Sequence, residues 1–482
     1  MPASPTLVWF RQDLRLDDQP ALRAALARGG PIVPVYIWAP EEEAPWAPGA
    51  ASRWWLHHSL AALHAELAKQ GSRLILRRGE SLAELRSVAQ ATGAHAVYWN
   101  RRYEPAAIRR DAKLKRALKS EGWEAESHNA ALLFEPWTVQ TGGGAPYQVF
   151  TPFWKACLKL PEPPEPLARP RTLPAPSRWP QSVSLDSLGL LPSRDWADGF
   201  HAHWTPGAKG ARTALKRFTT GILADYPAGR DRPDQAGTSR LSPHLHFGEI
   251  GPREVWHAVR ASAERTSGGG WVRAEETYLR EIGWREFAHH LLFHFPHTPH
   301  KPLRASFQSF PWRRNRPALD AWQRGATGFP IVDAGLRELW HTGWMHNRVR
   351  MIVASFLVKD LLISWREGAR WFWDTLVDAD LANNTLGWQW TAGCGADAAP
   401  FFRIFNPVSQ GEKFDPQGQY VRRWAPELKS LPDRYVHRPW ECPGLERSAA
   451  GVHLGMTYPH PLVDHANARD AALAAFAALT RI

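Results

Sequence analysis

Cysteine is nearly absent from this chain, which contains three in 482 residues. Cys157, Cys394 and Cys442 lie far apart without metal-ligand spacing, so we expect no disulfide framework and no zinc or iron–sulfur site. Such sparse, unpaired thiols are typical of a reducing compartment. We therefore expect a cytoplasmic protein without a bound metal.

Long apolar runs are also missing. The first ten residues contain no apolar run preceded by basic residues, so we expect no secretory signal. The most apolar helical stretch, Met351–Trp365, is interrupted by Lys359 and Asp360 and is too short to span a bilayer, which favours a buried core helix. No GxGxxG motif follows the first expected strand, so a sheet built on that strand need not bind NAD.

Tryptophan and positive charge are abundant. The chain has 26 Trp against 9 Tyr, and its net charge is +12. The charge favours a polyanionic partner, although a basic enzyme indifferent to DNA fits as well. Buried indoles each need a partner for the N–H group, so core packing rarely uses so many, whereas stacking on bases or carrying electrons would. Composition alone does not choose between these uses.

The first hundred residues alternate short apolar runs of strand length with helical patterns. The expected strands are Leu7–Phe10, Ile32–Trp38, Arg73–Leu76 and Ala96–Trp99, and the expected helices are Gln19–Arg28, Ser52–Gln70 and Leu82–Thr92. This alternation predicts a Rossmann-like, doubly wound parallel sheet.

The composition then changes twice. Leu160–Leu191 is proline-dense and polar, which predicts a linker laid over the surface between domains. After about His201 strand signals almost vanish and helical patterns continue to about Leu479. We therefore place an α/β domain at 1–131, a linker at 132–200 and an all-helical domain at 201–482.

Two clusters of the helical part suit a nucleotide. Ser242 before Pro243 predicts a helix start, where hydroxyls and amides can bind phosphate, although a plain capped helix fits too. Glu281, Trp284 and Arg285 share one helix face. That face could stack a base and bind its polar edge, or could be an amphipathic surface with an ion pair.

Two later clusters combine arginines with carboxylates. Arg350, within Gly343–Met351, leads into an apolar helix and would be costly there without a carboxylate or phosphate partner. Asp378 and Asp380 fit a loop before a helix, on which Asn384 and Trp388 lie one turn apart. Paired aspartates could equally complement a helix dipole.

In this order, the clusters resemble the class I cyclobutane pyrimidine dimer photolyases of the cryptochrome/photolyase family over nearly the whole chain. The segments that carry the resemblance are WFRQDLRLDDQPAL, TGFPIVDAGLRELWHTGWMHNRVRMIVASFLVKDLLISWREG and DADLANNTLGWQWTAGCGADAAPFFRIFNPVSQGEKFDP. The resemblance implies an α/β antenna domain, a long linker and a helical domain that binds FAD and DNA.

The resemblance also implies the cofactor and relay residues. FAD, active in its reduced form, would be bound by Tyr226, Thr238, Ser239, Arg240, Leu241, Ser242, Arg285, Arg350, Asp378, Asp380 and Asn384. Within this set Arg350 would pair with Asp378, and Asn384 would face flavin N5. The family's electron relay maps onto Trp388, Trp365 and Trp312, running from the flavin to the surface.

The function implied is a deoxyribodipyrimidine photo-lyase, a carbon–carbon lyase that repairs cyclobutane pyrimidine dimers in DNA by light-driven electron transfer. A flipped-out lesion would contact Arg230, Glu281, Trp284, Asn347, Arg348, Met351, Trp390 and Gln410, with Ser409 nearby. We expect a monomer that acts on DNA, without a membrane partner, in a bacterial-type cytoplasm and on the nucleoid during repair.

Three alternatives remain. A (6-4) photolyase has histidines where this chain has Asn347 and Met351. A cryptochrome photoreceptor often carries a long disordered tail, whereas this chain ends at Ile482, and it tends to lose residues kept here as Glu281, Trp284 and Met351. A flavoprotein that only binds DNA would not need the three-tryptophan relay.

The sequence leaves open which second chromophore, if any, serves as a light-harvesting antenna. Folate-binding members of the family have a carboxylate where this chain has Ala107. Methenyltetrahydrofolate, a deazaflavin, a flavin or an empty pocket are therefore all compatible, and Trp38, Arg53 and Arg102 are the candidate pocket residues.

Overall fold

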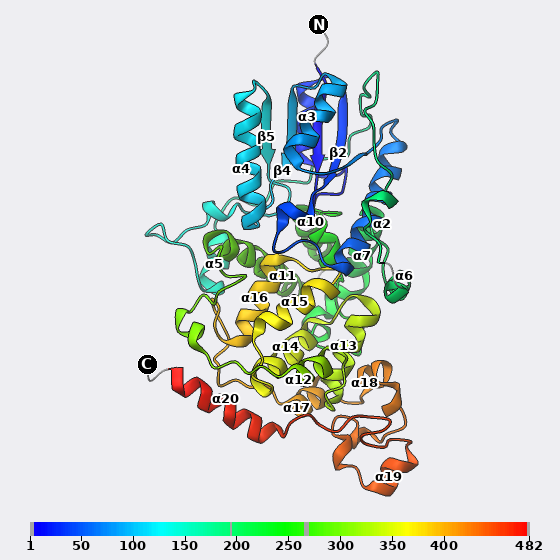
Figure 1. The fold of residues 1–482 in the computed structure, drawn as a ribbon, viewed down its shortest axis with the longest axis vertical. Coiled ribbons are helices and arrows are strands. Elements are labelled where there is room, and N and C mark those ends of the chain that lie inside the picture. The colour runs from blue at the N-terminus through cyan, green and yellow to red at the C-terminus, as the bar shows by residue number, and fades with distance from the viewer. Residues whose placement is uncertain (1–3, 193–194, 265–268, 480–482) are drawn as a thin grey trace.

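The computed structural model describes residues 4–192, 195–264 and 269–479, and it has an α/β region stacked on a helical region (Figure 1). The sheet has five parallel strands in the order β3-β2-β1-β4-β5. Its strands are β1 Thr6–Phe10, β2 Ile32–Trp38, β3 Ile75–Arg78, β4 Ala96–Asn100 and β5 Glu124–His128. The strand order reverses at β1, as in a doubly wound sheet, so the predicted fold class is confirmed.

Both faces of the sheet are covered because successive side chains of each strand point to opposite sides. One set of alternate residues packs with helices α1 (Pro20–Arg28) and α2 (Ala50–Ala68). The other set packs with α3 (Ser81–Thr92) and α4 (Pro105–Ser120). The central strands therefore read as continuous apolar runs, which is why the sequence predicted them.

Strand β5 and helix α4 were not predicted from the sequence. In β5, EAESH, Ala125 is buried while the other side chains are half-buried or exposed. An edge strand has one neighbour and needs little apolar surface, so its pattern is weak. Helix α4 is strongly basic on its outer side, and its buried residues are only Ala107, Leu114 and Leu118.

The segment expected as a linker, residues 132–200, contains both irregular chain and helix. Residues 161–180, all of which the structure describes, form no helix or strand. The segment before them does, because α5 (Phe150–Cys157) buries Phe150, Phe153 and Cys157 against α11 (Gly269–His294). Part of the expected linker thus belongs to the core of the helical region.

The second region is helical, as predicted, and no described residue after β5 belongs to a sheet strand. Besides α11, its helices are α6 Phe200–His203, α7 Ala208–Arg217, α8 Tyr226–Gly229, α9 Ser242–His246, α10 Pro252–Glu264, α12 Arg316–Gln323, α13 Pro330–Thr342, α14 Asn347–Ser355, α15 Trp365–Thr375, α16 Leu381–Ala392, α17 Pro407–Phe414, α18 Gln419–Trp424, α19 Gly444–Ala449 and α20 His465–Leu479. Within the described ranges, no helix is both long and apolar enough to cross a membrane.

The stretch expected as one core helix, Met351–Trp365, is divided. Helix α14 ends at Ser355, a π-helical turn covers Phe356–Asp360, and α15 begins at Trp365. The two charges in the turn are buried and paired: Lys359 Nζ donates to the carbonyl of Arg403 at 2.8 Å, and Asp360 Oδ1 lies 2.5 Å from His465 Nδ1. These partners stabilise charges that would be costly inside a continuous apolar helix.

The two regions share a core. Phe247, Trp344 and Val377 of the helical region belong to the same buried cluster as one face of the sheet. The junction is therefore fixed by apolar packing, and residues from both regions can form one site there.

Candidate functional site

Helix α16 is positioned by its first turn. Asp380 is the N-cap, and its Oδ1 accepts a hydrogen bond from the Asn383 amide at 2.8 Å. Asn384 Nδ2 donates to the carbonyl of Ala369 on α15 at 3.0 Å. Trp388, one turn after Asn384, is buried at 2% exposure. The sequence prediction of a loop aspartate followed by this helix is confirmed.

Arg350 and Asp378 form the ion pair that the resemblance implied. The Arg350 Nη2 atom donates to both carboxylate oxygens, at 3.1 and 2.8 Å, and its Nε donates to the carbonyl of Met345 at 2.8 Å. The carboxylate of Asp378 is buried, so the arginine charge on α14 has the counter-charge that burial demands.

Asp380 lies between two histidines. Its Oδ2 is 3.5 Å from His289 Nε2 and 3.7 Å from His246 Nδ1. Burial opposes ionisation, but these two nearby histidines hold the pKa of Asp380 well below its usual range. The carboxylate therefore stays charged beneath the first turn of α16.

The segment around Arg240 is a candidate anion site. The guanidinium lies between two indoles, 4.4 Å from the ring centroid of Trp204 and 4.5 Å from that of Trp344. Burial lowers its pKa, and its Nε and Nη2 atoms have no hydrogen-bond partner among the described residues. The two indole rings hold the guanidinium in place, and binding of the FAD diphosphate by Arg240 stays a prediction.

The neighbouring predicted cofactor residues are brought together by packing. Tyr226 starts α8 and is buried, and Tyr278 donates to Ser239 Oγ at 3.1 Å. Helix α9 begins at Ser242, with Leu241 at the N-cap and no side-chain cap, so the expected capping role of Ser242 is wrong. Its hydroxyl instead accepts from Trp344 Nε1 at 3.4 Å. Thr238 lies in the loop just before.

The three relay tryptophans show graded burial. Trp388 and Trp365 are buried, and Trp312 is half-buried. The Trp388 ring packs on Gly368, one turn after Trp365 on α15. The Arg313 amide donates to the carbonyl of Leu362 at 2.7 Å, which brings the chain next to Trp312 beside the start of α15. Two of the three indoles are buried and the third is half-buried, and their action as an electron relay stays a prediction.

The predicted lesion residues surround residues 230 and 231. Arg230 donates to Glu281 Oε1 on α11 at 2.7 Å, and Arg348 Nη2 donates to Asp231 Oδ1 at 2.8 Å. Arg348 also lies 3.8 Å from the sulfur of Met351. Arg230 and Asp231 are consecutive and therefore connect α11 to α14. Four of the predicted lesion residues form two contacting pairs, Arg230 with Glu281 and Arg348 with Met351.

The other predicted lesion residues lie on the same helices or on α17. Trp284 is half-buried on α11, Asn347 is exposed at the start of α14, and Trp390 and Gln410 are half-buried on α16 and α17. Arg285 points to the segment after β5, where its Nη1 donates to the carbonyl of Ala131 at 2.7 Å. A cofactor contact by Arg285 stays a prediction.

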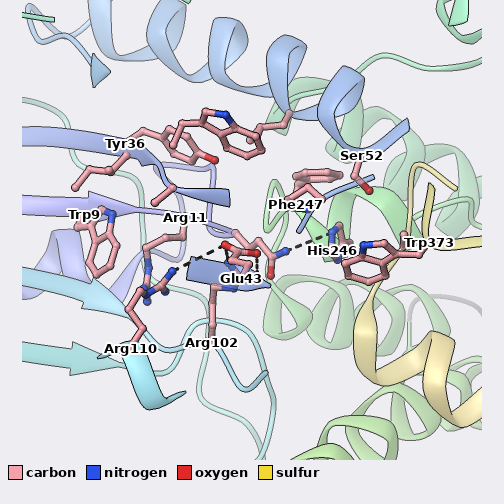
Figure 2. Close-up of a pocket in the computed structure, with 17 residues that line it drawn as sticks. Trp9, Arg11, Tyr36, Glu43, Ser52, Arg102, Arg110, His246, Phe247 and Trp373 are labelled. Carbon is pink, nitrogen blue, oxygen red and sulfur yellow. Dashed lines mark hydrogen bonds and ion pairs between the residues drawn. The ribbon is translucent and has the colours of Figure 1, made fainter. Parts of the chain in front are cut away.

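A cleft that is partly open to solvent lies at the carboxyl ends of β1 and β2 against the helical region (Figure 2). Two of the predicted antenna residues, Trp38 and Arg102, line it, together with Trp9, Tyr36, His246 and Trp373. Arg53 is not among the lining residues, although its neighbour Ser52 is. Aromatic walls with a few charged groups suit a flat, polar-edged chromophore.

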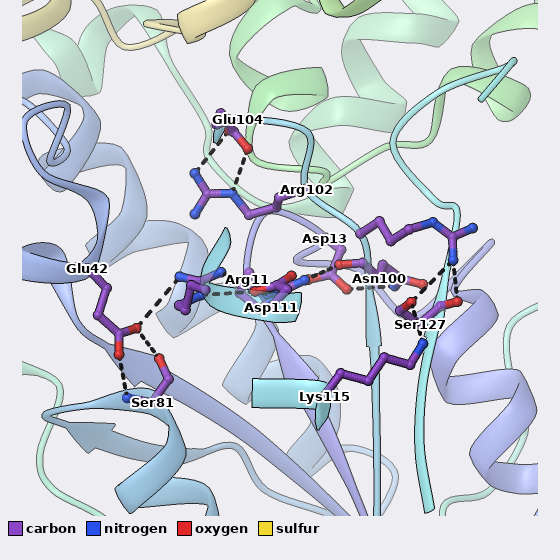
Figure 3. A network of polar contacts seen from close by, with 12 residues as sticks. Arg11, Asp13, Glu42, Ser81, Asn100, Arg102, Glu104, Asp111, Lys115 and Ser127 are labelled. Carbon is purple, nitrogen blue, oxygen red and sulfur yellow. Dashed lines mark hydrogen bonds and ion pairs between the residues drawn. The ribbon is translucent and has the colours of Figure 1, made fainter. Parts of the chain in front are cut away.

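The polar floor of this cleft belongs to a network that spans the strand ends (Figure 3). Arg102 donates to Glu43 and Glu104, with closest contacts of 2.5 and 3.0 Å. Burial alone would lower the pKa of Arg102, but the two carboxylates hold it well above its ordinary value. Arg11 pairs with Asp111 at 3.0 Å in the same network. These ion pairs fix the arginines in place before any ligand enters.

Several residues of the junction were missed by sequence reasoning. His246 and His289 flank Asp380, and Phe150 stacks on Trp284. Their histidine and phenylalanine side chains carried no spacing signal, since each partner lies far away in sequence. Among the described residues, no group of three or more His, Cys, Asp or Glu side chains could hold a metal ion.

Comparisons with known proteins agree with this arrangement. A family model described as DNA photolyase matches residues 6–173, and one described as the FAD binding domain of DNA photolyase matches residues 278–478. A deoxyribodipyrimidine photo-lyase of Agrobacterium fabrum is 51% identical over 99% of this chain and 98% of its own length. Cryptochrome-1 of Arabidopsis thaliana is 43% identical over 96% of this chain and 69% of its own length.

A solved structure is also similar throughout. The crystal structure of a bacterial class III photolyase from Agrobacterium tumefaciens has a TM-score of 0.96 and 51% identity, and the match covers 100% of this chain and 99% of that one. The narrower prediction of class I is therefore not supported. The matched FAD-binding domain identifies FAD as the cofactor. This chain belongs to the photolyase/cryptochrome family.

Proposed function

We propose that this protein is a class III-type photolyase that repairs cyclobutane pyrimidine dimers in DNA under blue or near-UV light. The observation that supports the proposal is that α14 contributes side chains to both candidate sites. Arg350 on this helix pairs with Asp378, while Arg348 on the same helix pairs with Asp231. Asp231 follows Arg230, which donates to Glu281 on α11. One rigid helix thus connects the two candidate sites.

When bound and reduced, FAD supplies the electron that light transfers to the lesion and that returns after the ring opens. The protein's own residues provide position and charge. Arg240 would neutralise the diphosphate, and Asn384 would present its amide to the flavin. Asp378 would be held by Arg350, and Trp388, Trp365 and Trp312 would carry electrons from the surface to reduce an oxidised cofactor.

On the lesion side, Trp284 and Trp390 would stack on the extruded pyrimidines. Stacking contributes about 1–3 kcal/mol per base, and extrusion of a damaged pair costs a few kcal/mol, so two indoles offset much of that cost. Glu281, already fixed by Arg230, would accept a hydrogen bond from a pyrimidine imide. Asn347 and Gln410 would complete the rim of the pocket.

We further propose that the cleft between the two regions holds the antenna chromophore. Trp38 and Arg102 support this role by their position, and the two carboxylates on Arg102 favour a ligand that is not strongly anionic there. An α/β antenna domain at 1–131, a linker at 132–200 and a catalytic domain at 201–482 remain the proposed division. We propose a monomer acting on DNA in the cytoplasm.

The test is light-dependent repair. Purified protein is mixed with irradiated oligothymidylate and held either under blue light or in darkness, and dimer loss is followed by chromatography. We expect dimers to disappear in the light only, and (6-4) products to persist. No repair in the light with a full complement of reduced FAD would indicate a cryptochrome-type photoreceptor, the second candidate that the Arabidopsis relative supports.

A further inference from the structure

Helix α5 supports the lesion face of α11 through a close aromatic stack. The ring of Phe150 lies on the indole of Trp284 with centroids 3.8 Å apart and planes within 7°. Phe150 is completely buried, whereas Trp284 is half-buried. One face of the indole is therefore covered by protein, and its exposed part is left for a ligand.

Two contacts of Phe150 and a close approach of α5 to α11 fix its ring in this position. Its ring is nearly parallel to that of Trp154, one turn later on α5, at 6.4 Å and 11°. The two helices approach closely because residue 283 is glycine: a Cβ there would meet carbons of the Trp154 ring at 2.6 and 2.8 Å. The amide of Phe150 donates to Asp397 Oδ2 at 3.1 Å, which ties α5 to the turn after α16.

We propose that Phe150 is a positioning residue for the lesion, and this inference rests on the proposed function of Trp284. By stacking on the inner face of the indole, Phe150 holds the ring in one orientation before DNA binds. Immobilising a side chain at an interface costs about 0.5–1.5 kcal/mol, so an indole fixed in advance binds the extruded base more tightly. The linker segment thus shapes substrate recognition.

The experiment compares lesion binding by Phe150→Leu and Phe150→Met, which keep an apolar side chain but remove the flat ring. Phe153→Leu is the matched control, because Phe153 is equally buried on α5 and packs on Phe287 and His290. Binding in darkness to a duplex with one thymine dimer, and to the same duplex undamaged, is measured by fluorescence anisotropy on FAD-loaded protein.

We expect both Phe150 variants to bind the damaged duplex about two- to ten-fold more weakly, with little change for undamaged DNA. The Phe153 variant should keep the preference for damage. Under light, the Phe150 variants should show a raised apparent KM and a smaller change in the repair rate at saturation. In a Trp284→Ala background, the Phe150 substitution should have no further effect on the damaged duplex.

Equal lesion preference in the Phe150 and Phe153 variants would overturn the inference, as would a full effect of Phe150→Leu without Trp284. A wild-type protein that neither prefers nor repairs damaged DNA would instead refute the proposed function. The two failures are therefore distinguishable. If Phe150→Leu does not fold, Phe150→Met, whose unbranched side chain adapts to irregular space, gives the same comparison.

Discussion

The packing of Trp388 on Gly368 gives a sharp prediction. A Cβ on residue 368 would lie 2.0 Å from Cη2 of Trp388 and 2.4 and 2.5 Å from the two neighbouring ring carbons. Carbon atoms in contact are about 3.5–4.0 Å apart, so Gly368→Ala must displace the indole by roughly 1.5 Å. The displaced ring is the relay tryptophan on the helix of Asn384.

In Gly368→Ala, two contributions to the free energy of unfolding oppose each other. Overpacking a dense core costs about 1–3 kcal/mol, while alanine stabilises a helix interior by up to about 1 kcal/mol over glycine. We expect net destabilisation of up to about 2 kcal/mol by urea unfolding. Gly387→Ala on α16 is the stability control, because no heavy atom lies within 4 Å of its added Cβ, and it should gain about 0.5–1 kcal/mol.

The functional assay is light-driven reduction of oxidised flavin with an external reductant. Gly368→Ala should slow it, because the first relay indole has moved. A variant as stable as Gly387→Ala that also photoreduces at the wild-type rate would contradict the packing described here and the relay role drawn from it.

Three further predictions concern single side chains. Glu286 accepts hydrogen bonds from the amides of Leu133 and Phe134 at 2.9 and 3.1 Å. Glu286→Ala should therefore lower the free energy of unfolding, measured in urea, by about 1–3 kcal/mol for each amide left without an acceptor, and Glu286→Gln should lower it less. Equal losses in the two variants would contradict this role. Burial raises the pKa of Glu338 to about 7 from 4.5, so the unfolded state loses its proton first and the free energy of unfolding should fall as pH rises between these values. Glu338→Gln should abolish that part of the slope, and an unchanged slope would refute the assignment. Trp312→Phe should slow flavin photoreduction and leave binding of damaged DNA unchanged, and a weakened binding would place Trp312 in the DNA site instead.

Local patterns in the sequence were sufficient for most of the architecture. Alternating apolar strands and helices predicted β1 to β4 and the doubly wound sheet, because burial of both sheet faces leaves a continuous apolar signature. The proline-dense stretch and the later helical periods separated the two regions. The polar edge strand β5 was not predicted, because a strand that pairs on one side only needs few apolar residues.

The site depended more on chain-distant contacts. The family motifs suggested that Arg350 and Asp378 pair, but nothing in their spacing of 28 residues requires it. The division of the expected core helix at Phe356–Asp360 follows from Arg403 and His465, which come from later segments to pair the buried charges.

The sequence by itself determined most of the strands and helices and which residue types are available for flavin, electron and base contacts. Only the tertiary structure decided that Phe150 of the linker backs Trp284, that His246 and His289 flank Asp380, and that a cleft opens between the regions. The physical reason is the distance along the sequence between the residues that make each contact. Helix and strand periodicity reflects burial of neighbours along the chain, whereas these contacts form only after segments about ninety or more residues apart have packed together.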